Sequence, residues 1–301
     1  MMRIYRDNRR KINMSDFEMQ IDEAVAERLS EESAIRVPVR KLDRDMGQAA
    51  NTLTATEARY LVDSYYGMQE GRIRANNQIR ALTASGEPHE SIAWLSTESR
   101  VLEESVKRAL DAYSASHPVG SRMRTVVGVG PVISAGLLAH IDITRAPTAG
   151  AIWRYAGLDP TSEWKKGQKR PHNASLKTLC WKLGESFVKV CNHKDAVYGK
   201  LYQERKEVEL AKNEAGAFAD QAAAKLEKFN IGKTTDAYKA YSVGKLPPAH
   251  IHARAKRVAV KMFLSHLHQV WHEVEFGKTA PVPYVFEFAD KEHVHKIEPN
   301  W

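Results

Sequence analysis

Residues 126–141 decide the fold of this chain, and they read Val126-Val-Gly-Val-Gly-Pro-Val-Ile-Ser-Ala-Gly-Leu-Leu-Ala-His-Ile141. Glycine allows a tight backbone turn, and proline is suited to the first turn of a helix. The stretch therefore predicts a turn at Gly128 and Gly130 that leads directly into a helix of small apolar residues.

The Gly-Val-Gly-Pro turn also has the form of the hairpin in a helix-hairpin-helix motif. In such a hairpin, amide N–H groups at the start of the second helix face a phosphate, because they have no partner within the helix and the helix dipole favours negative charge. These contacts read the nucleic-acid backbone and not its sequence. The alternative is that Gly128 and Gly130 form only a tight turn between two packed helices.

A long helical hairpin is predicted upstream of the turn. An apolar stripe, which includes Ile73, Leu95 and Leu102, recurs near multiples of three and four over residues 54–82 and again over 92–117. Ser-Gly-Glu-Pro at 85–88 separates the two runs. Thr54 or Thr56 is expected to cap the first helix. Two antiparallel helices of this length form a coiled-coil-like hairpin, which serves as a structural spacer or a dimerisation arm.

Downstream of a lysine-rich loop at 161–173, the sequence predicts a helix at residues 175–190, a long polar helical region at 198–229 and a final helix at 250–274. The chain lacks the alternation of strands and helices that a parallel sheet requires. The expected fold class is therefore mainly α: a long antiparallel helical hairpin followed by a helical domain that contains the helix-hairpin-helix.

The chain is expected to divide into four parts. They are a mobile N-terminal arm (1–50) with a small helix around Phe17 to Leu29, the helical hairpin (51–118), the helix-hairpin-helix domain (119–277) with an insertion at 213–245, and a C-terminal tail (278–301) with a short extended segment at 284–288.

The composition indicates a globular protein of the cytoplasm. The 301 residues are 43% hydrophobic, carry a net charge of +8 and include only two cysteines, Cys180 and Cys191. This excludes a disulfide framework and a cysteine-rich zinc site, and it favours a reducing compartment. No apolar run is long enough for a membrane span, so no membrane partner is expected. The positive charge favours an anionic partner.

The expected partner is nucleic acid, DNA or RNA. Residues 161–212 contain twelve Lys and Arg against six acidic residues, and they follow aromatic residues. Basic side chains interleaved with aromatic rings suit a phosphate backbone with unstacked bases. The alternative is a solvated helical face. The candidate binding residues are Gly128, Gly130, Trp164, Lys165, Lys166, Lys169, Arg170, Lys177, Arg254 and Arg257.

Histidines are frequent in the last predicted helix, where His268 and His272 have the i, i+4 spacing of two metal ligands. No carboxylate or cysteine at ligand spacing completes a set, so no metal and no cofactor are expected. His293 and His295 in the tail are interpreted in the same way.

Residues 126–141, followed by Trp153-Arg-Tyr-Ala-Gly-Leu-Asp-Pro160, resemble the C-terminal transposase domain of the insertion-sequence family whose recombinases use a bridge RNA. The resemblance rests on the glycine turn, on a helix that ends near Asp142, and on the Tyr-Ala-Gly-Leu-x-Pro signature. It extends over about residues 120–275. Family members also place a coiled-coil segment before this domain, as residues 54–115 would.

Two departures from the family pattern predict that catalysis is lost. The family has a ribonuclease-H-like domain with four carboxylates, which the 50 residues before the hairpin are too few to form. The family also has a nucleophilic serine in a Ser-Gly pair after the signature, where this chain has Lys166-Gly167. Ser162 and Ser175 are the alternatives for a shifted nucleophile.

Three hypotheses follow. The first is a nucleic-acid-binding protein that is derived from a transposase domain and catalytically inactive. The second is a transposase, recombinase or nuclease with a non-standard active site or a partner subunit. The third is an architectural protein that forms a homo-oligomer through the 51–118 helices. The first is our prediction, and a mobile element or a phage is the expected origin.

Overall fold

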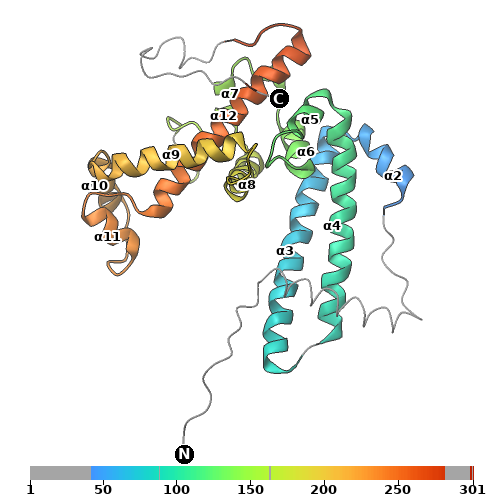
Figure 1. Ribbon diagram of the computed structural model, residues 1–301, viewed down its shortest axis with the longest axis horizontal. Helices are drawn as coiled ribbons and strands as arrows, with labels where there is room; N and C mark the ends of the chain where they lie inside the picture. The colour runs from blue at the N-terminus through green and yellow to red at the C-terminus, as the bar shows by residue number, and fades with distance from the viewer. Residues whose placement is uncertain (1–41, 88, 163, 282–298, 300) are drawn as a thin grey trace, which may run out of the picture. The chain divides into compact units, whose positions relative to one another are not determined.

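The computed structural model describes residues 42–87, 89–162, 164–281, 299 and 301, and all regular structure in this part of the chain is helical (Figure 1). The prediction of a mainly α fold is therefore confirmed. The elements are α2 (Arg44–Ala49), the 3₁₀ turn η1 (Ala50–Thr52), α3 (Ala55–Ser85), α4 (Glu90–Ser116), α5 (Pro118–Met123), α6 (Pro131–His140), the 3₁₀ turn η2 (Ile143–Arg145), α7 (Ala149–Tyr155), α8 (Ala174–Lys189), α9 (Val197–Glu214), α10 (Ala219–Lys228), α11 (Asp236–Ser242) and α12 (Pro248–Phe276).

Some predictions lie outside the described residues: the helix around Phe17 to Leu29, the extended segment at 284–288, and the histidines at 293 and 295. Within the described residues, no helix combines the length and the apolar character needed to cross a membrane.

The described residues divide into two compact units, and the division cuts through the helical hairpin. One unit contains residues 63–107, which are the distal parts of α3 and α4. The other contains residues 44–62 and everything described from 108 onward. The start of α3 belongs to this second unit, where the guanidinium of Arg59 donates to the carbonyl of Ala139 at 2.6 Å. The structural division therefore falls inside the segment 51–118 that the sequence predicts as one domain.

A capping box starts α3. The hydroxyl of Thr54 accepts from the amide of Glu57 at 3.3 Å, and the amide of Thr54 donates to the carboxylate of Glu57 at 2.8 Å. These two bonds satisfy backbone donors that have no partner within the helix. Of the two predicted capping residues, Thr54 is the one that caps the helix.

In the first unit, α3 and α4 run side by side and are joined by polar contacts (Figure 1). Arg72 of α3 forms an ion pair with Glu103 of α4 at 2.7 Å, and Ser96 donates to Asn76 at 2.6 Å. Polar side chains thus occupy inner positions of the hairpin.

The predicted apolar stripe is only partly buried. Ile73, Leu95 and Leu102 are exposed, whereas the small residues Ala75 and Ser105 are buried. The prediction that this stripe packs one helix against the other is wrong at the three exposed positions, because small and polar side chains take the inner face instead. Self-association through this hairpin stays a prediction.

The second unit is built around α12, which packs against α7, α8 and α9. Its centre is aromatic: the ring of Tyr198 lies 5.0 Å from that of Phe187 and 5.2 Å from that of Phe263. Burial of large rings contributes much of the hydrophobic stabilisation of such a core. This core holds α8, α9 and α12 together and fixes the loops that leave their ends.

Helix α6 is buried on all sides, as expected for a helix without a polar face. Gly136 allows it to approach α8, because a Cβ at this position would come within 2.7 Å of Leu179. The predicted turn into an apolar helix at 126–141 is therefore confirmed.

The helical region predicted over residues 198–229 is confirmed, and it consists of two helices. α9 ends at Glu214 and α10 starts at Ala219, with Gly216 at φ 76° between them. This left-handed conformation suits glycine and stops the helix. The predicted loose stretch before Pro248 also contains a helix, α11, which contacts α10.

One asparagine closes the base of the segment predicted as an insertion, residues 213–245. The buried side chain of Asn213 donates to the carbonyl of Leu246 at 3.0 Å and accepts from its amide at 2.8 Å. The segment therefore leaves the helical core and returns to it at one point.

A buried ion-pair cluster links α9 to α12. The side chain of Glu209 is 1% exposed and accepts from Arg254 at 2.7 Å and Arg205 at 2.5 Å. Burial raises the pKa of Glu209, but the hydrogen bond from Arg254 and the positive charges of Arg205 and Arg254 outweigh burial, so the pKa lies below its ordinary value.

The substitution Glu209→Gln is expected to lower the free energy of unfolding by about 2 kcal/mol at pH 7, because two partly buried guanidinium groups lose their counter-charge. A carboxylate whose pKa is lowered by folding stabilises the fold above its unfolded pKa of about 4.3, and this contribution is lost as the pH falls through the folded pKa. The difference between wild type and variant should therefore shrink below about pH 4 in urea unfolding. Glu207→Gln, at an exposed position of the same helix, is the control; equal losses in both variants would contradict the assignment.

Candidate nucleic-acid interface

The predicted glycine turn joins α5 to α6 and packs against the end of α8. Gly128 has φ 97°, and a Cβ there would come within 3.0 Å of the ring of Phe187. The hydroxyl of Ser186 donates to the carbonyl of Gly128 at 2.7 Å. Both the backbone conformation and the close packing therefore require glycine at this position.

Gly130 has a different environment. It is the N-cap residue of α6 with extended backbone (φ −87°, ψ 176°), it is exposed, and nothing lies within 4 Å of where its Cβ would be. Pro131 is the first residue of α6, as expected. Of the two glycines, Gly130 is the one with open space beside it.

A second feature is the connection from α7 to α8, residues 156–173, which we call the lysine loop. Its two ends are tied together: the amide of Asn173 donates to the carbonyl of Tyr155 at 2.9 Å, and the side-chain amide donates to the Tyr155 hydroxyl at 3.0 Å. The side-chain oxygen of Asn173 also caps α8 by accepting from the amide of Leu176 at 2.9 Å. The loop thus starts and ends at one fixed point.

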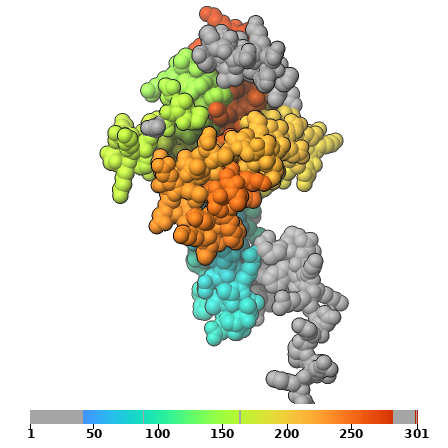
Figure 2. All heavy atoms as spheres, turned by 90° about the vertical axis from the view of Figure 1, so that its left-hand side faces the viewer, coloured from blue at the N-terminus to red at the C-terminus, as the bar shows by residue number. Residues whose placement is uncertain are grey.

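The described part of the lysine loop carries four cations without an ion-pair partner. These cations are Lys165, Lys166, Lys169 and Arg170, and all four are exposed. None of them forms an ion pair with a residue that the structure describes. The guanidinium of Arg170 lies 5.6 Å from the centre of the Trp164 ring, and the indole of Trp164 donates to the carbonyl of Gln168 at 2.8 Å. The loop stands out from the surface as the yellow-green spheres of Figure 2.

The pKa of His172, at the end of the lysine loop, is lower than its ordinary value. Partial burial lowers the pKa of His172, and the charges of Lys177 and Arg170 lower it further. His172 and Lys177 also lie beside Gly157, at the start of the loop. Lys177, which the sequence predicts as a binding residue, therefore belongs to the same surface as the lysine loop.

The structure does not bring the glycine turn and the lysine loop together. Gly128 packs on Ser186 and Phe187 near the C-terminal end of α8, whereas the loop enters α8 at its N-terminal end. A helix of 16 residues is about 24 Å long. The candidate residues thus form two separate surfaces at opposite ends of one helix.

The two predicted arginines of α12 differ in their surroundings. Arg254 donates to the buried Glu209, and its guanidinium lies 4.5 Å from the centre of the Phe218 ring. Arg257 is exposed. The guanidinium of Arg254 is therefore already engaged within the protein, and Arg257 is the more accessible of the two.

The two histidines of α12 with the spacing of metal ligands, His268 and His272, bond to backbone groups. A ring nitrogen of His268 lies 2.9 Å from the carbonyl of Ala146, and one of His272 lies 3.1 Å from the carbonyl of Lys278. Among the described residues, no group of three or more histidine, cysteine or carboxylate side chains is close enough to hold a metal ion.

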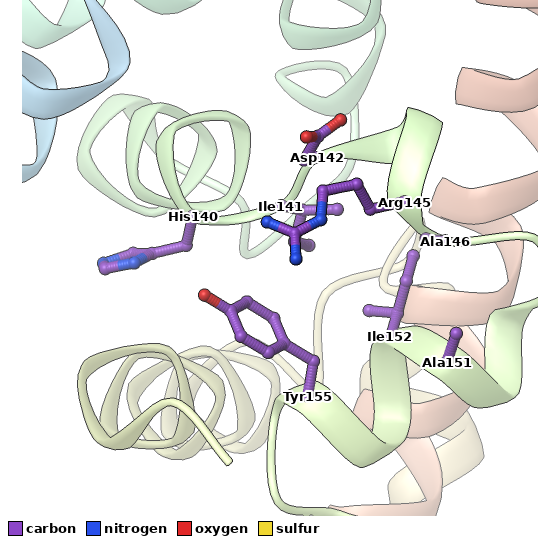
Figure 3. Close-up of a pocket in the computed structure, with 8 residues that line it drawn as sticks. All are labelled: His140, Ile141, Asp142, Arg145, Ala146, Ala151, Ile152 and Tyr155. Atoms are coloured by element: carbon purple, nitrogen blue, oxygen red, sulfur yellow. The ribbon is translucent and has the colours of Figure 1, made fainter.

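A pocket of about 180 Å³, which the sequence did not reveal, lies beside the closed end of the lysine loop (Figure 3). Its polar lining comes from the end of α6, from η2 and from α7. The lining residues are His140, Ile141, Asp142, Arg145, Ala146, Ala151, Ile152 and Tyr155. In the sequence, Asp142 and Tyr155 stand out only through the family resemblance. No sequence pattern marks Arg145, because folding alone brings it close to Tyr155.

A second residue missed at the sequence level is Trp181 on the outer face of α8. Its side chain is 57% exposed, and the ammonium of Lys256 lies 5.1 Å from its ring centre. Helical periodicity could have indicated its position, because the buried α8 residues Leu176, Leu179 and Leu183 place Trp181 off their face.

Residues 120–195 match the family described as transposase IS116/IS110/IS902 family. The matched segment contains the glycine turn, the pocket, the lysine loop and α8. The predicted resemblance is thereby confirmed for this part of the chain at the level of a transposase family. Searches of curated proteins and of solved structures gave no match.

Proposed function

We propose that the protein binds nucleic acid through the lysine loop, with a domain derived from a transposase, and that it reads the backbone and not the sequence. The observation that carries the proposal is the set of four exposed cations beside Trp164, inside the segment that matches a transposase family. Cations without counter-charges are available to phosphates.

The loop offers two kinds of contact. Lys165, Lys166, Lys169 and Arg170 can each neutralise a phosphate, and the ring of Trp164 can stack on an unpaired base. Phosphate contacts position a protein without carrying sequence information. Because DNA and RNA both contain backbone phosphates, the proposal includes both polymers, and its test must compare them.

The test is fluorescence anisotropy of the full chain against matched single- and double-stranded DNA and RNA over a range of salt concentrations. If four phosphates are neutralised, the logarithm of the binding constant for duplex DNA should fall with the logarithm of salt concentration with a slope of about −3.6. Absence of binding to all four polymers at low salt would contradict the proposal. A slope near zero would contradict the role of the cations.

The proposed function does not include strand cleavage. Lys166 and Gly167 stand where the resemblance places a Ser-Gly pair, and an amine does not supply the oxygen nucleophile of a serine. Ser162 and Ser175 are the nearest serines, and neither hydroxyl is hydrogen-bonded to a histidine or carboxylate among the described residues. An activating base is therefore missing beside both serines in the described part of the chain.

A second candidate function is a transposase, recombinase or nuclease, and the family match itself favours it. Such an activity would require a shifted nucleophile or a partner subunit. Incubation of the protein with supercoiled and branched DNA in the presence of Mg²⁺ separates the two functions. Nicked or joined products would favour the enzyme, and unchanged DNA that is nevertheless bound would favour the binding protein.

A further inference from the structure

The pocket beside the lysine loop contains a cation that no described carboxylate neutralises. The guanidinium of Arg145 has no ion pair and no hydrogen bond with any residue that the structure describes. It extends into the pocket toward the side of Tyr155 (Figure 3). The lining carboxylate, Asp142, points away from it and accepts instead from the amide of Thr144 at 3.1 Å and from its hydroxyl at 2.5 Å.

The hydroxyl of Tyr155 can donate a hydrogen bond to a ligand in the pocket. The side-chain oxygen of Asn173 accepts from the amide of Leu176, so its NH₂ group must face Tyr155, and it donates to the hydroxyl oxygen at 3.0 Å. A hydroxyl that accepts from an amide keeps its own proton for another acceptor. Arg145 and Tyr155 therefore offer the pocket hydrogen-bond donors only.

Donors of this kind select an anion with several acceptor oxygens. Arginine pairs with phosphate oxygens through two parallel hydrogen bonds, which are stronger than bonds between neutral groups. The other side of the pocket is apolar, formed by Ala146, Ala151 and Ile152. Apolar walls exclude water and strengthen such an ion pair.

We propose that this pocket binds the terminal phosphate monoester of a nucleic-acid strand. The inference rests on the proposed function, because the strand that ends in the pocket lies on the lysine loop, and Asn173 joins the two features. A small pocket with one apolar side suits the end of a strand, whereas a backbone that continues in both directions follows a groove. A terminal phosphate also carries more negative charge than a phosphodiester, since its second pKa is about 6.

The experiment compares three single-stranded DNA oligonucleotides of one sequence with an internal fluorophore: one with a 5′-phosphate, one with a 3′-phosphate and one with hydroxyl groups at both ends. The full chain is expected to bind one phosphorylated strand at least about tenfold more tightly than the hydroxyl-ended strand. Equal affinity for all three would overturn the pocket assignment and leave the proposed function intact. Failure to bind any strand would overturn both.

Single substitutions test whether the pocket causes the preference for a phosphorylated strand. Arg145→Gln and Tyr155→Phe are expected to reduce the ratio of the two affinities to about one. Arg154→Gln is the matched control, because this exposed arginine of α7 is outside the pocket lining and pairs with Asp159 at 3.2 Å; it should keep the wild-type ratio. A wild-type ratio in Arg145→Gln would overturn the inference.

A competition arm separates a strand end from a free nucleotide. AMP and inorganic phosphate are added at the concentration at which the phosphorylated strand saturates the protein. No displacement is expected, because a free nucleotide lacks the contacts of the strand with the lysine loop. Displacement at that concentration would contradict the assignment to a strand end.

Discussion

Replacement of Lys166 and Arg170 together by glutamate is expected to weaken nucleic-acid binding about 100-fold or more at low salt. Each substitution removes a phosphate contact and puts a negative charge beside the backbone. Because Arg170 also stacks near Trp164, its loss removes support from the ring that would contact a base. The measurement is the dissociation constant by fluorescence anisotropy at fixed salt, and circular dichroism checks that the variant is folded.

The control for this experiment makes the same change in net charge elsewhere. Lys228 of α10 and Lys233 are exposed and lie outside the segment that matches the transposase family. Lys228→Glu with Lys233→Glu should retain an affinity close to that of the wild type. If both double variants lose affinity equally, binding depends only on net charge and the loop is not the site. Wild-type affinity in the loop variant would contradict the proposal directly.

The substitution Gly120→Ala is expected to lower the free energy of unfolding by at least about 3 kcal/mol. Gly120 lies in α5, and a Cβ there would overlap the backbone carbonyl of Ser114 and come within 2.8 Å of Leu138. A backbone carbonyl at the end of α4 cannot move aside as a flexible side chain can, so α5 or α4 must shift. Urea unfolding followed by circular dichroism measures the loss.

Gly130→Ala is the matched glycine control. An alanine Cβ at this position would meet no atom within 4 Å, and φ −87° is ordinary for any residue. Its free energy of unfolding should fall by about 1 kcal/mol or less, because alanine is a poorer N-cap residue than glycine. A Gly120→Ala variant as stable as Gly130→Ala would contradict the packing described for α5. A Gly120→Ala variant that does not fold at all, beside a folded Gly130→Ala, would agree with it.

The sequence was most informative where local chemistry and tertiary structure agree. Gly130 and Pro131 start α6, Thr54 and Glu57 start α3, and both starts follow from residue types a few positions apart. Capping and turn formation depend on short-range hydrogen bonds and on allowed backbone angles, so a single sequence reveals them. The helical class of the fold follows in the same way from the spacing of apolar residues.

Spacing alone was misleading where a helix has polar partners. Leu95 and Leu102 have the spacing of an inner face, yet they are exposed, and the ion pair of Arg72 with Glu103 lies between the helices instead. Within the predicted helical region 198–229, Gly216 interrupts the helix and separates α9 from α10. A sequence shows which face could be buried, whereas the partner helix decides which face is buried.

For the candidate site, the sequence by itself determined which kinds of group are available. They are lysine and arginine side chains close to Trp164, a glycine turn, and a signature that includes Tyr155. Only the tertiary structure decided how they combine. It separated the glycine turn from the lysine loop along α8, engaged Arg254 with Glu209, and brought Arg145 beside Tyr155. The physical reason is that charge and backbone conformation belong to residues, whereas distance between residues far apart in the chain comes from the packing of buried helices such as α6, α8 and α12.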